Sequence, residues 1–231
     1  MKLEIEMLQK EYESVLSGYA MLLAYRLMNL CVKADANSLL PAVVYVKGSA
    51  KKIEEVADVG IRSEDVMEVY PFHEDLINPI GLAIKEVHPE FKQKLETIHI
   101  EEAKKDFKYL SLTMPEVDQP RHDVLLQGVD VCADVTKGQT EAAKVQYTAR
   151  LEKELLDSPG EEVDEAHDNF DAVLDEHNKR VQSILDDKHN EIEEALQRFQ
   201  QKLAEQAQSQ LEQMQAQGAD VTSQLQMPSD Q

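Results

Sequence analysis

Histidine and cysteine are the side chains of this chain most able to bind metal or to act as nucleophiles, and it has seven and two of them. His167 and His177 are ten residues apart in a predicted helix, just under three turns, so they cannot share one ion. The chain has neither a Cys–x–x–Cys pair nor a His-Glu-x-x-His motif. The sequence therefore predicts no metal site and no cofactor, and His177, on an apolar stripe, is predicted to be packed.

Cys31 and Cys132 are isolated in the sequence. A catalytic cysteine needs a neighbouring base and a lowered pKa, and Cys31 has only Lys33 nearby. We expect a buried, unreactive thiol. His73, followed by two acids, suits a strand-to-helix turn better than a metal site. These patterns predict a protein that is not an enzyme and has no small-molecule substrate.

Basic residues are scarce. The chain has 24 Lys and Arg against 45 Asp and Glu, a formal net charge of −21, which argues against general adhesion to nucleic acid. The run Lys47-Gly-Ser-Ala-Lys51-Lys52 lacks the spacing of a phosphate-binding loop and predicts a basic hairpin loop. It is predicted to lie at one end of its module with Lys104, Lys105 and Lys108. That end is either a local contact for RNA or an acidic protein, or simply solvated.

Acidic residues are concentrated in one stretch. Between Leu151 and Leu196 the sequence has 16 acids and 4 bases. This segment is either a solvated helix face or a surface for a basic protein partner, and it should face away from RNA.

Apolar residues at three- and four-residue steps predict three long helices. The first covers residues 3–31, the second begins near Gln119 with Pro120 in its first turn, and the third covers about 163–203. The second has the weaker stripe, made of Val124, Leu125, Val131, Val135, Ala142, Val145, Ala149 and Leu155. Residues 157–160 predict the turn that separates the second and third helices.

Residues 39–114 have a different residue pattern, in which short runs rich in β-branched residues alternate with turn residues. They predict strands at 43–46, 59–62, 66–70, 97–100 and 107–112, and a helix opened by Asn78-Pro79.

We therefore predict an α+β protein in which an elongated three-helix bundle carries an inserted small α/β, β-sandwich-like module. The bundle is residues 1–36 with 116–205 and the module is 37–115. Residues 206–231 are a Gln-rich tail that we expect to be flexible, the alternatives being a linker, a segment ordered only on a partner and a helix extension. The two chain crossings predict a hinge, formed by Ala34, Asp35, Ala36, Asn37, Pro115, Glu116 and Val117. No apolar run is long enough to span a membrane, and the acidic N-terminus resembles neither a signal nor a transit peptide.

This order of elements resembles the ribosome recycling factor family. The local sequences that carry the resemblance are Ser38-Leu-Leu-Pro-Ala-Val-Val-Tyr-Val-Lys-Gly48, residues 53–75, Asn78-Pro-Ile-Gly-Leu-Ala-Ile84 and Tyr109-Leu-Ser-Leu-Thr-Met-Pro115. They are similar to the family's Ser-Leu-Leu segment, its Ala-x-Val-x-Val-Glu-Asp strand, the short helix that follows, and its Leu-Pro exit. The resemblance covers about residues 5–196. It implies a bundle that lies on the intersubunit face of the large ribosomal subunit, and a module that works with a translocase GTPase.

The sequence departs from the family where the family binds ribosomal RNA. At the position of the family's Arg-Thr-Gly-Arg-Ala-Ser motif this chain has Cys31-Val-Lys-Ala-Asp-Ala36. In the region that corresponds to the family's Arg-Asn-x-Arg-Arg cluster, the basic residues of this chain are Lys137 and Lys144 alone. The remaining candidates for contact with RNA or the ribosome are Lys33, Arg121, Lys137, Lys144, Arg150, Lys51 and Lys52.

These departures suggest a diverged, non-enzymatic ribosome factor that acts in assembly or subunit anti-association and is held partly by protein contacts. The alternatives are a genuine recycling factor and an acidic helical scaffold for basic proteins. Divergent translation factors are common in organelles, so we expect the mitochondrial matrix, and otherwise the cytoplasm.

Overall fold

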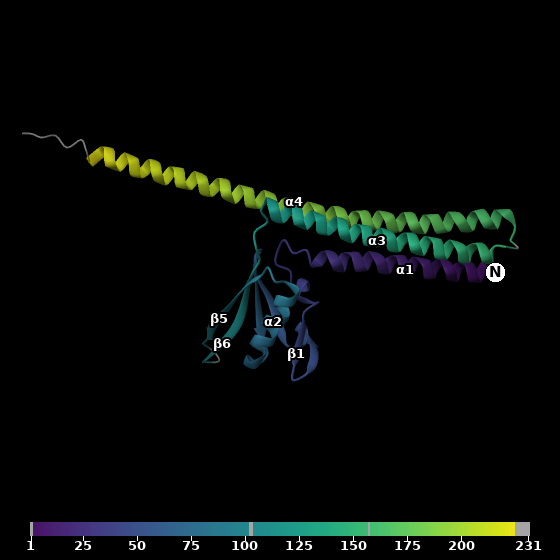
Figure 1. The fold of residues 1–231 in the computed structure, drawn as a ribbon, viewed down its shortest axis with the longest axis horizontal. Helices are drawn as coiled ribbons and strands as arrows, with labels where there is room; N and C mark the ends of the chain where they lie inside the picture. The colour runs from purple at the N-terminus through teal and green to yellow at the C-terminus, as the bar shows by residue number, and fades with distance from the viewer. Residues whose placement is uncertain (1, 102–103, 157, 225–231) are drawn as a thin grey trace, which may run out of the picture.

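In a computed structural model of the protein, residues 2–101, 104–156 and 158–224 are described. Helices α1 (Lys2–Met28) and α3 (Gln119–Glu154) lie side by side with the first part of α4 (Gly160–Gln224) as an elongated bundle. A small α+β module is attached where α1 ends and α3 begins, and α4 continues alone past it (Figure 1). Helices α1 and α3 run antiparallel, because residue 26 contacts residue 139 while residue 11 contacts residues 147 and 150. The predicted fold class is confirmed.

The bundle core consists of two apolar clusters separated by a polar layer. One cluster, around Tyr12 and Phe170, lies at the end away from the module, and the other, around Leu23 and Ile192, lies near it. Between them the Nε2 of His177 lies 2.9 Å from the hydroxyl of Thr140, and both side chains are buried. The packed histidine predicted at 177 is confirmed.

Helix α3 and its C-cap bury Leu125 and Leu155 of the predicted apolar stripe, but the valines of the stripe are exposed. Val124, Val131, Val135 and Val145 are exposed, although they belong to the predicted apolar stripe. The buried face consists of His122, Leu125, Val129, Thr136, Thr140, Ala143, Tyr147 and Leu151. The prediction failed at these positions because the buried face includes His122, Thr136 and Thr140. Their polar groups bond to Glu193, to backbone carbonyls of α3 and to His177 of α4, so these residues escape a search for apolar side chains.

Two helix ends also differ from the predictions. Helix α1 ends at Met28 instead of residue 31, because Leu30 leaves the helix to pack against α3 at Gly128. Helix α4 continues to Gln224, so residues 206–224 form the helix extension that was an alternative to a flexible tail. Neither Gly nor Pro occurs between Gly160 and Gly218, and Gln, Ala and Glu are good helix formers. Residues 225–231 of the predicted tail, and Asp157 of the predicted turn, lie outside the described residues.

The module contains two antiparallel sheets. Strands β3 (Ala57–Ser63), β4 (Val66–Pro71), β6 (Lys105–Thr113) and β5 (Lys92–Ile100) form a four-stranded sheet in that order. Strands β1 (Val43–Val46) and β2 (Ser49–Lys52) form a separate hairpin. The module also has helix α2 (Ile77–Val87) and the short 3-10 helices η1 (Ala36–Leu39), η2 (Ile53–Glu55) and η3 (Glu74–Leu76).

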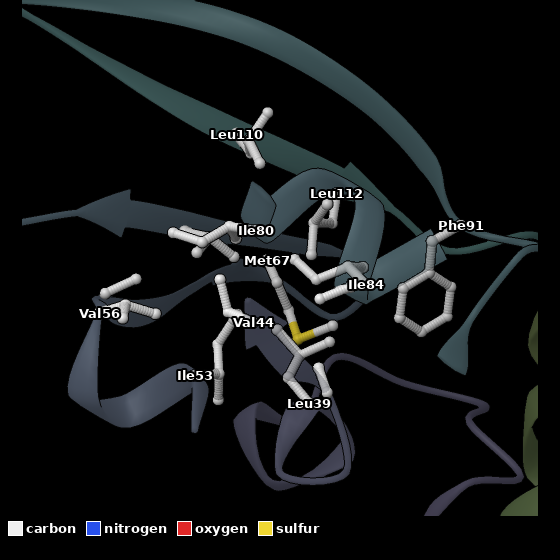
Figure 2. Close-up of a cluster of buried hydrophobic side chains, with 14 of the residues drawn as sticks. Leu39, Val44, Ile53, Val56, Met67, Ile80, Ile84, Phe91, Leu110 and Leu112 are labelled. Carbon is white, nitrogen blue, oxygen red and sulfur yellow. The ribbon is translucent and has the colours of Figure 1, made fainter. Parts of the chain in front are cut away.

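The module core draws on all three kinds of element. Ile80 and Ile84 of α2 meet Val44 of the hairpin and Met67 and Leu112 of the sheet, and each of these side chains is fully buried (Figure 2). This gives the module an apolar core of its own, independent of the bundle.

Residues 47–52, predicted as a basic hairpin loop, do belong to a hairpin, but most of them form a strand. Lys47 and Gly48 have positive φ angles of 50° and 84°, as a tight two-residue hairpin turn requires. The turn is therefore only two residues long, and Ser49–Lys52 pairs with Val43–Val46 as strand β2.

Two glycines of α3 provide a test of the packing. A Cβ at Gly138 would have no atom within 4 Å, whereas a Cβ at Gly128 would lie 2.9 Å from Cδ2 of Leu30. Replacing a mid-helix glycine by alanine in open space should stabilise the fold by about 0.5–1 kcal/mol. We expect G138A to raise the free energy of unfolding in urea by this amount and G128A to raise it by clearly less. Equal gains would show that Leu30 does not rest on Gly128.

Candidate functional site

The first candidate site is the joint between the bundle and the module. At the first chain crossing, the N–H of Ala34 donates to the carbonyl of Glu64 at 2.6 Å, and Asp35 accepts from the N–H of Asn37 at 2.9 Å, capping η1. Ala36 and Asn37 lie within η1. These four residues of the predicted hinge are therefore bonded to the module or belong to it.

The second crossing attaches to both bodies. The N–H of Met114, just before Pro115, donates to the carbonyl of Asp65 at 2.9 Å. Two residues later Glu116 pairs with Lys202 of α4, and Val117, only 3% exposed, packs in the bundle. The hinge at these positions stays a prediction, but the structure defines what a rotation there would have to break.

A buried histidine in the module is bonded to the first crossing. The Nε2 of His88, which is 1% exposed, lies 2.9 Å from the carbonyl of Ser38 and 3.9 Å from the Sγ of Cys31. Its Nδ1 lies 3.1 Å from Glu90, and its ring stacks on Phe91. Sequence reasoning gave His88 no role, because its partners lie 50 and 57 residues away and no local pattern announces them.

The surroundings of His88 favour the imidazolium. Burial by itself lowers the pKa of this histidine, but the hydrogen bonds with Cys31, Glu90 and the Ser38 carbonyl outweigh burial and raise the pKa to about 10. Both ring nitrogens face acceptors, so both donate when the ring is charged. Cys31 is 4% exposed, so the buried thiol predicted at this position is confirmed.

The second candidate site is the set of basic residues predicted to face a ribosome, and most of them are engaged within the chain. Arg150 makes two 2.9 Å bonds to the carboxylate of Glu11 and lies over the ring of Tyr147. Lys33 lies 3.5 Å from Glu191. Lys51 and Lys52 pair with Glu55 and Glu54, and Arg121 donates to the carbonyl of Cys31.

Only Lys137 and Lys144 among these candidates are exposed and make no ion pair with another described residue. They are seven residues apart on α3, about two turns, which places them on the same side of the helix. The structure thus leaves a short cationic row on α3 and no broad basic surface from the predicted set.

The basic residues of the module do not form one patch. The β1–β2 and β5–β6 hairpins both point away from the bundle, but they lie on opposite sides of α2 (Figure 1). Lys108 pairs with Glu74. The predicted basic end is therefore divided between two separate hairpins.

The acids of α4 lie mostly on its exposed face, as in the run from Glu161 to Asp175. An open cleft of about 650 Å³ lies between the end of α1 and α4, lined by both basic and acidic side chains, among them Lys33, Lys188 and Glu191. Within the described part of the chain, no three His, Cys, Asp or Glu side chains gather as a metal site would require. The described helices also include none with the length and apolar character to cross a membrane.

The protonation of His88 predicts a pH dependence of stability. Its folded pKa of about 10 lies above the usual value of 6.5, so its contribution is complete below about pH 6.5 and is lost as pH rises toward 10. The difference in urea unfolding free energy between the native protein and H88Q should shrink over that range. Burial lowers the pKa of His177, so H177Q should behave oppositely, with a difference that shrinks as pH falls below 6.5. An H88Q difference that is flat with pH would contradict the charged state.

Comparison with known proteins identifies the fold. No protein-family profile matches the sequence, and no curated protein matches it. Among solved structures, the solution structure of a ribosome recycling factor matches with a TM-score of 0.66 and 14% identity, over 83% of this chain and 98% of the other.

A second similar structure shows the T. thermophilus ribosome recycling factor and the E. coli elongation factor G, both bound to the E. coli post-termination complex. Its recycling factor matches with a TM-score of 0.53 and 17% identity, over 81% of this chain and 98% of that one. The resemblance seen in the sequence is confirmed at the level of fold, and the chain has the fold of ribosome recycling factor over nearly the whole length of that protein.

Proposed function

We propose that this protein is a non-enzymatic, ribosome-associated factor that binds the large ribosomal subunit at its intersubunit face. The observation that carries the proposal is the match over 98% of a recycling factor chain, which includes both the bundle and the module. Another similar structure is a recycling factor bound to a post-termination complex. A factor of this shape acts by occupying and prying apart surfaces, which requires no bond chemistry.

The charges of the bundle favour a role in ribosome assembly or subunit anti-association over ordinary RNA-anchored recycling. Arg150, Arg121 and Lys33 are bonded to groups of their own chain. Lys137 and Lys144 alone would make about two phosphate contacts, which predicts a slope of only about −2 in log K against log salt. A net charge of −21 opposes any further approach to RNA.

The apolar side chains on the outer face of α3 supply an alternative source of affinity. Val131 and Val145 are 63% and 68% exposed, and Val124 and Val135 lie on the same side at helical spacing. Four exposed valines in a row on one helix are typical of a surface that binds another protein. We therefore infer that ribosomal or assembly proteins make the main contact, with RNA as a minor one.

Two other functions remain candidates, each favoured by one observation. The complete two-body architecture suits a genuine recycling factor that works with a translocase GTPase and releases ribosomes after termination. The exposed acids of α4 suit a scaffold for basic proteins, with no ribosome involved. We place the protein in the mitochondrial matrix, and otherwise in the cytoplasm, on the ground of its divergence.

Sedimentation of native lysate at low and high salt separates these functions. We expect the protein to migrate with free or precursor large subunits in both buffers. The variant V131D/V145D should leave the particles in both, because the charges disrupt apolar contacts without disturbing the core. The variant K137E/K144E should weaken binding only at low salt.

The matched control for K137E/K144E is K85E/K179E, which makes the same change in net charge at two other exposed lysines. It should sediment like the native protein. Binding to post-termination ribosomes that is lost at moderate salt would instead favour ordinary recycling. Confinement to the light fractions in both buffers would overturn the ribosomal proposal and favour the scaffold.

A further inference from the structure

The segment that leads from α1 into the module is held by one cation from each body. From the bundle, the Nη2 of Arg121 donates to the carbonyl of Cys31 at 3.0 Å. From the module, the charged ring of His88 donates through Nε2 to the carbonyl of Ser38 at 2.9 Å. The two carbonyls are seven residues apart in the chain, so the cations hold the segment near its two ends.

Each cation is itself fixed in its own body. Arg121 lies in the first turn of α3, and its backbone N–H donates to the capping carboxylate of Asp118 at 3.0 Å. His88 follows the last residue of α2, with its ring stacked on Phe91 at 4.4 Å and its Nδ1 bonded to Glu90. A bond from Arg121 therefore fixes its end of the segment relative to the bundle, and a bond from His88 fixes the other end relative to the module.

Glu90 links the two cations electrostatically. Burial raises the pKa of this carboxyl group, but the hydrogen bond from His88, a backbone hydrogen bond and the charge of His88 outweigh burial and lower it, with the smallest contribution from the positive charge of Arg121. A carboxylate of the module thus lies in the field of a guanidinium of the bundle.

The side chains of the same segment alternate between the bodies. Leu30 and Val32 pack against the apolar cluster of the bundle, whereas Cys31 and Ala34 belong to the cluster of the module. Apolar contacts of this kind tolerate sliding, since they have little directionality. The bonds from Arg121 and His88 are directional and charge-assisted, so they fix the angle.

We propose that Arg121 and His88 are positioning residues that together clamp the Cys31–Ser38 segment and set the orientation of the module relative to the bundle. The other polar links at the joint among the described residues are the backbone bonds from Ala34 to Glu64 and from Met114 to Asp65, which hold each crossing to the module, and exposed ion pairs of Arg198 with Glu64, Lys202 with Glu116 and Lys33 with Glu191. Exposed pairs contribute little. Release of the clamp would therefore free the module to rotate while both bodies stay folded.

Single-molecule energy transfer on the full chain tests the clamp. Dyes attached through encoded azide side chains at Ala50 of the hairpin and Glu141 of α3, both exposed, leave the native cysteines untouched. The native protein should give one narrow distribution of transfer efficiency. R121M and H88Q, which release the segment from opposite bodies, should each broaden the distribution and shift its mean.

The matched control is R180M, because Arg180 donates to Ser17 within the bundle at 3.2 Å. It should leave the distribution unchanged. Circular dichroism must show native helix content in every variant, which separates loss of the clamp from loss of the fold. An unchanged narrow distribution in a folded R121M/H88Q double variant would overturn the proposal, as would equal broadening in R180M.

Discussion

The bundle and the module share no buried apolar cluster among the described residues, and the relation of the two bodies depends on this separation. Each has its own core, one around Met67 and Ile84, the others along the three long helices. Burial of apolar surface is the main source of stability, but it acts here within each body and not between them. Their relative position is therefore left to a few hydrogen bonds at the two crossings, among which those of Arg121 and His88 reach the first linker from opposite sides.

The bundle meets a different requirement, because it must be long and straight. Three aliphatic helices with a uniform apolar stripe could slide past one another in steps of one turn, since neighbouring registers bury similar areas. The bond between Thr140 and His177 opposes such a slip, because a shifted register would leave the buried Nε2 of His177 without a partner, as its Nδ1 already is among the described residues. Burial lowers the pKa of His177, so the layer is neutral near physiological pH and adds no buried charge. The resulting rod can hold a module at a fixed distance from its far end.

The sequence predicted the helices, the inserted module and most strands, because each has a short-range signal in periodicity or in turn residues. It failed where the decision depended on distant partners. Val131 and Val135 were predicted as part of the apolar stripe and are exposed, whereas Thr136 and Thr140, which that stripe left out, are buried. The contact of His88 with Ser38 joins residues 50 positions apart and leaves no local pattern. The sequence identified which residues are cations, but it did not show which of them are free to bind a partner. Whether Arg150 is free depends on Glu11, which lies in another helix.

The fate of the cations links the fold to the function proposed for it. Arg150 and Lys33 are the right residue types to bind phosphate, yet each is committed to a carboxylate of a neighbouring helix, and Arg121 is committed to a linker carbonyl. In an acidic chain this outcome is expected, since a free guanidinium or ammonium finds a carboxylate within its own protein more readily than a phosphate beyond a field of net charge −21. The same residues thus reinforce the bundle and its joint, and they leave the rod with its shape and an exposed row of valines. A factor with these properties would recognise a ribosomal particle by the fit of its surface to proteins. The clamp at the joint would then matter more for binding than in an RNA-anchored factor, because such a fit requires a fixed angle between the bundle and the module.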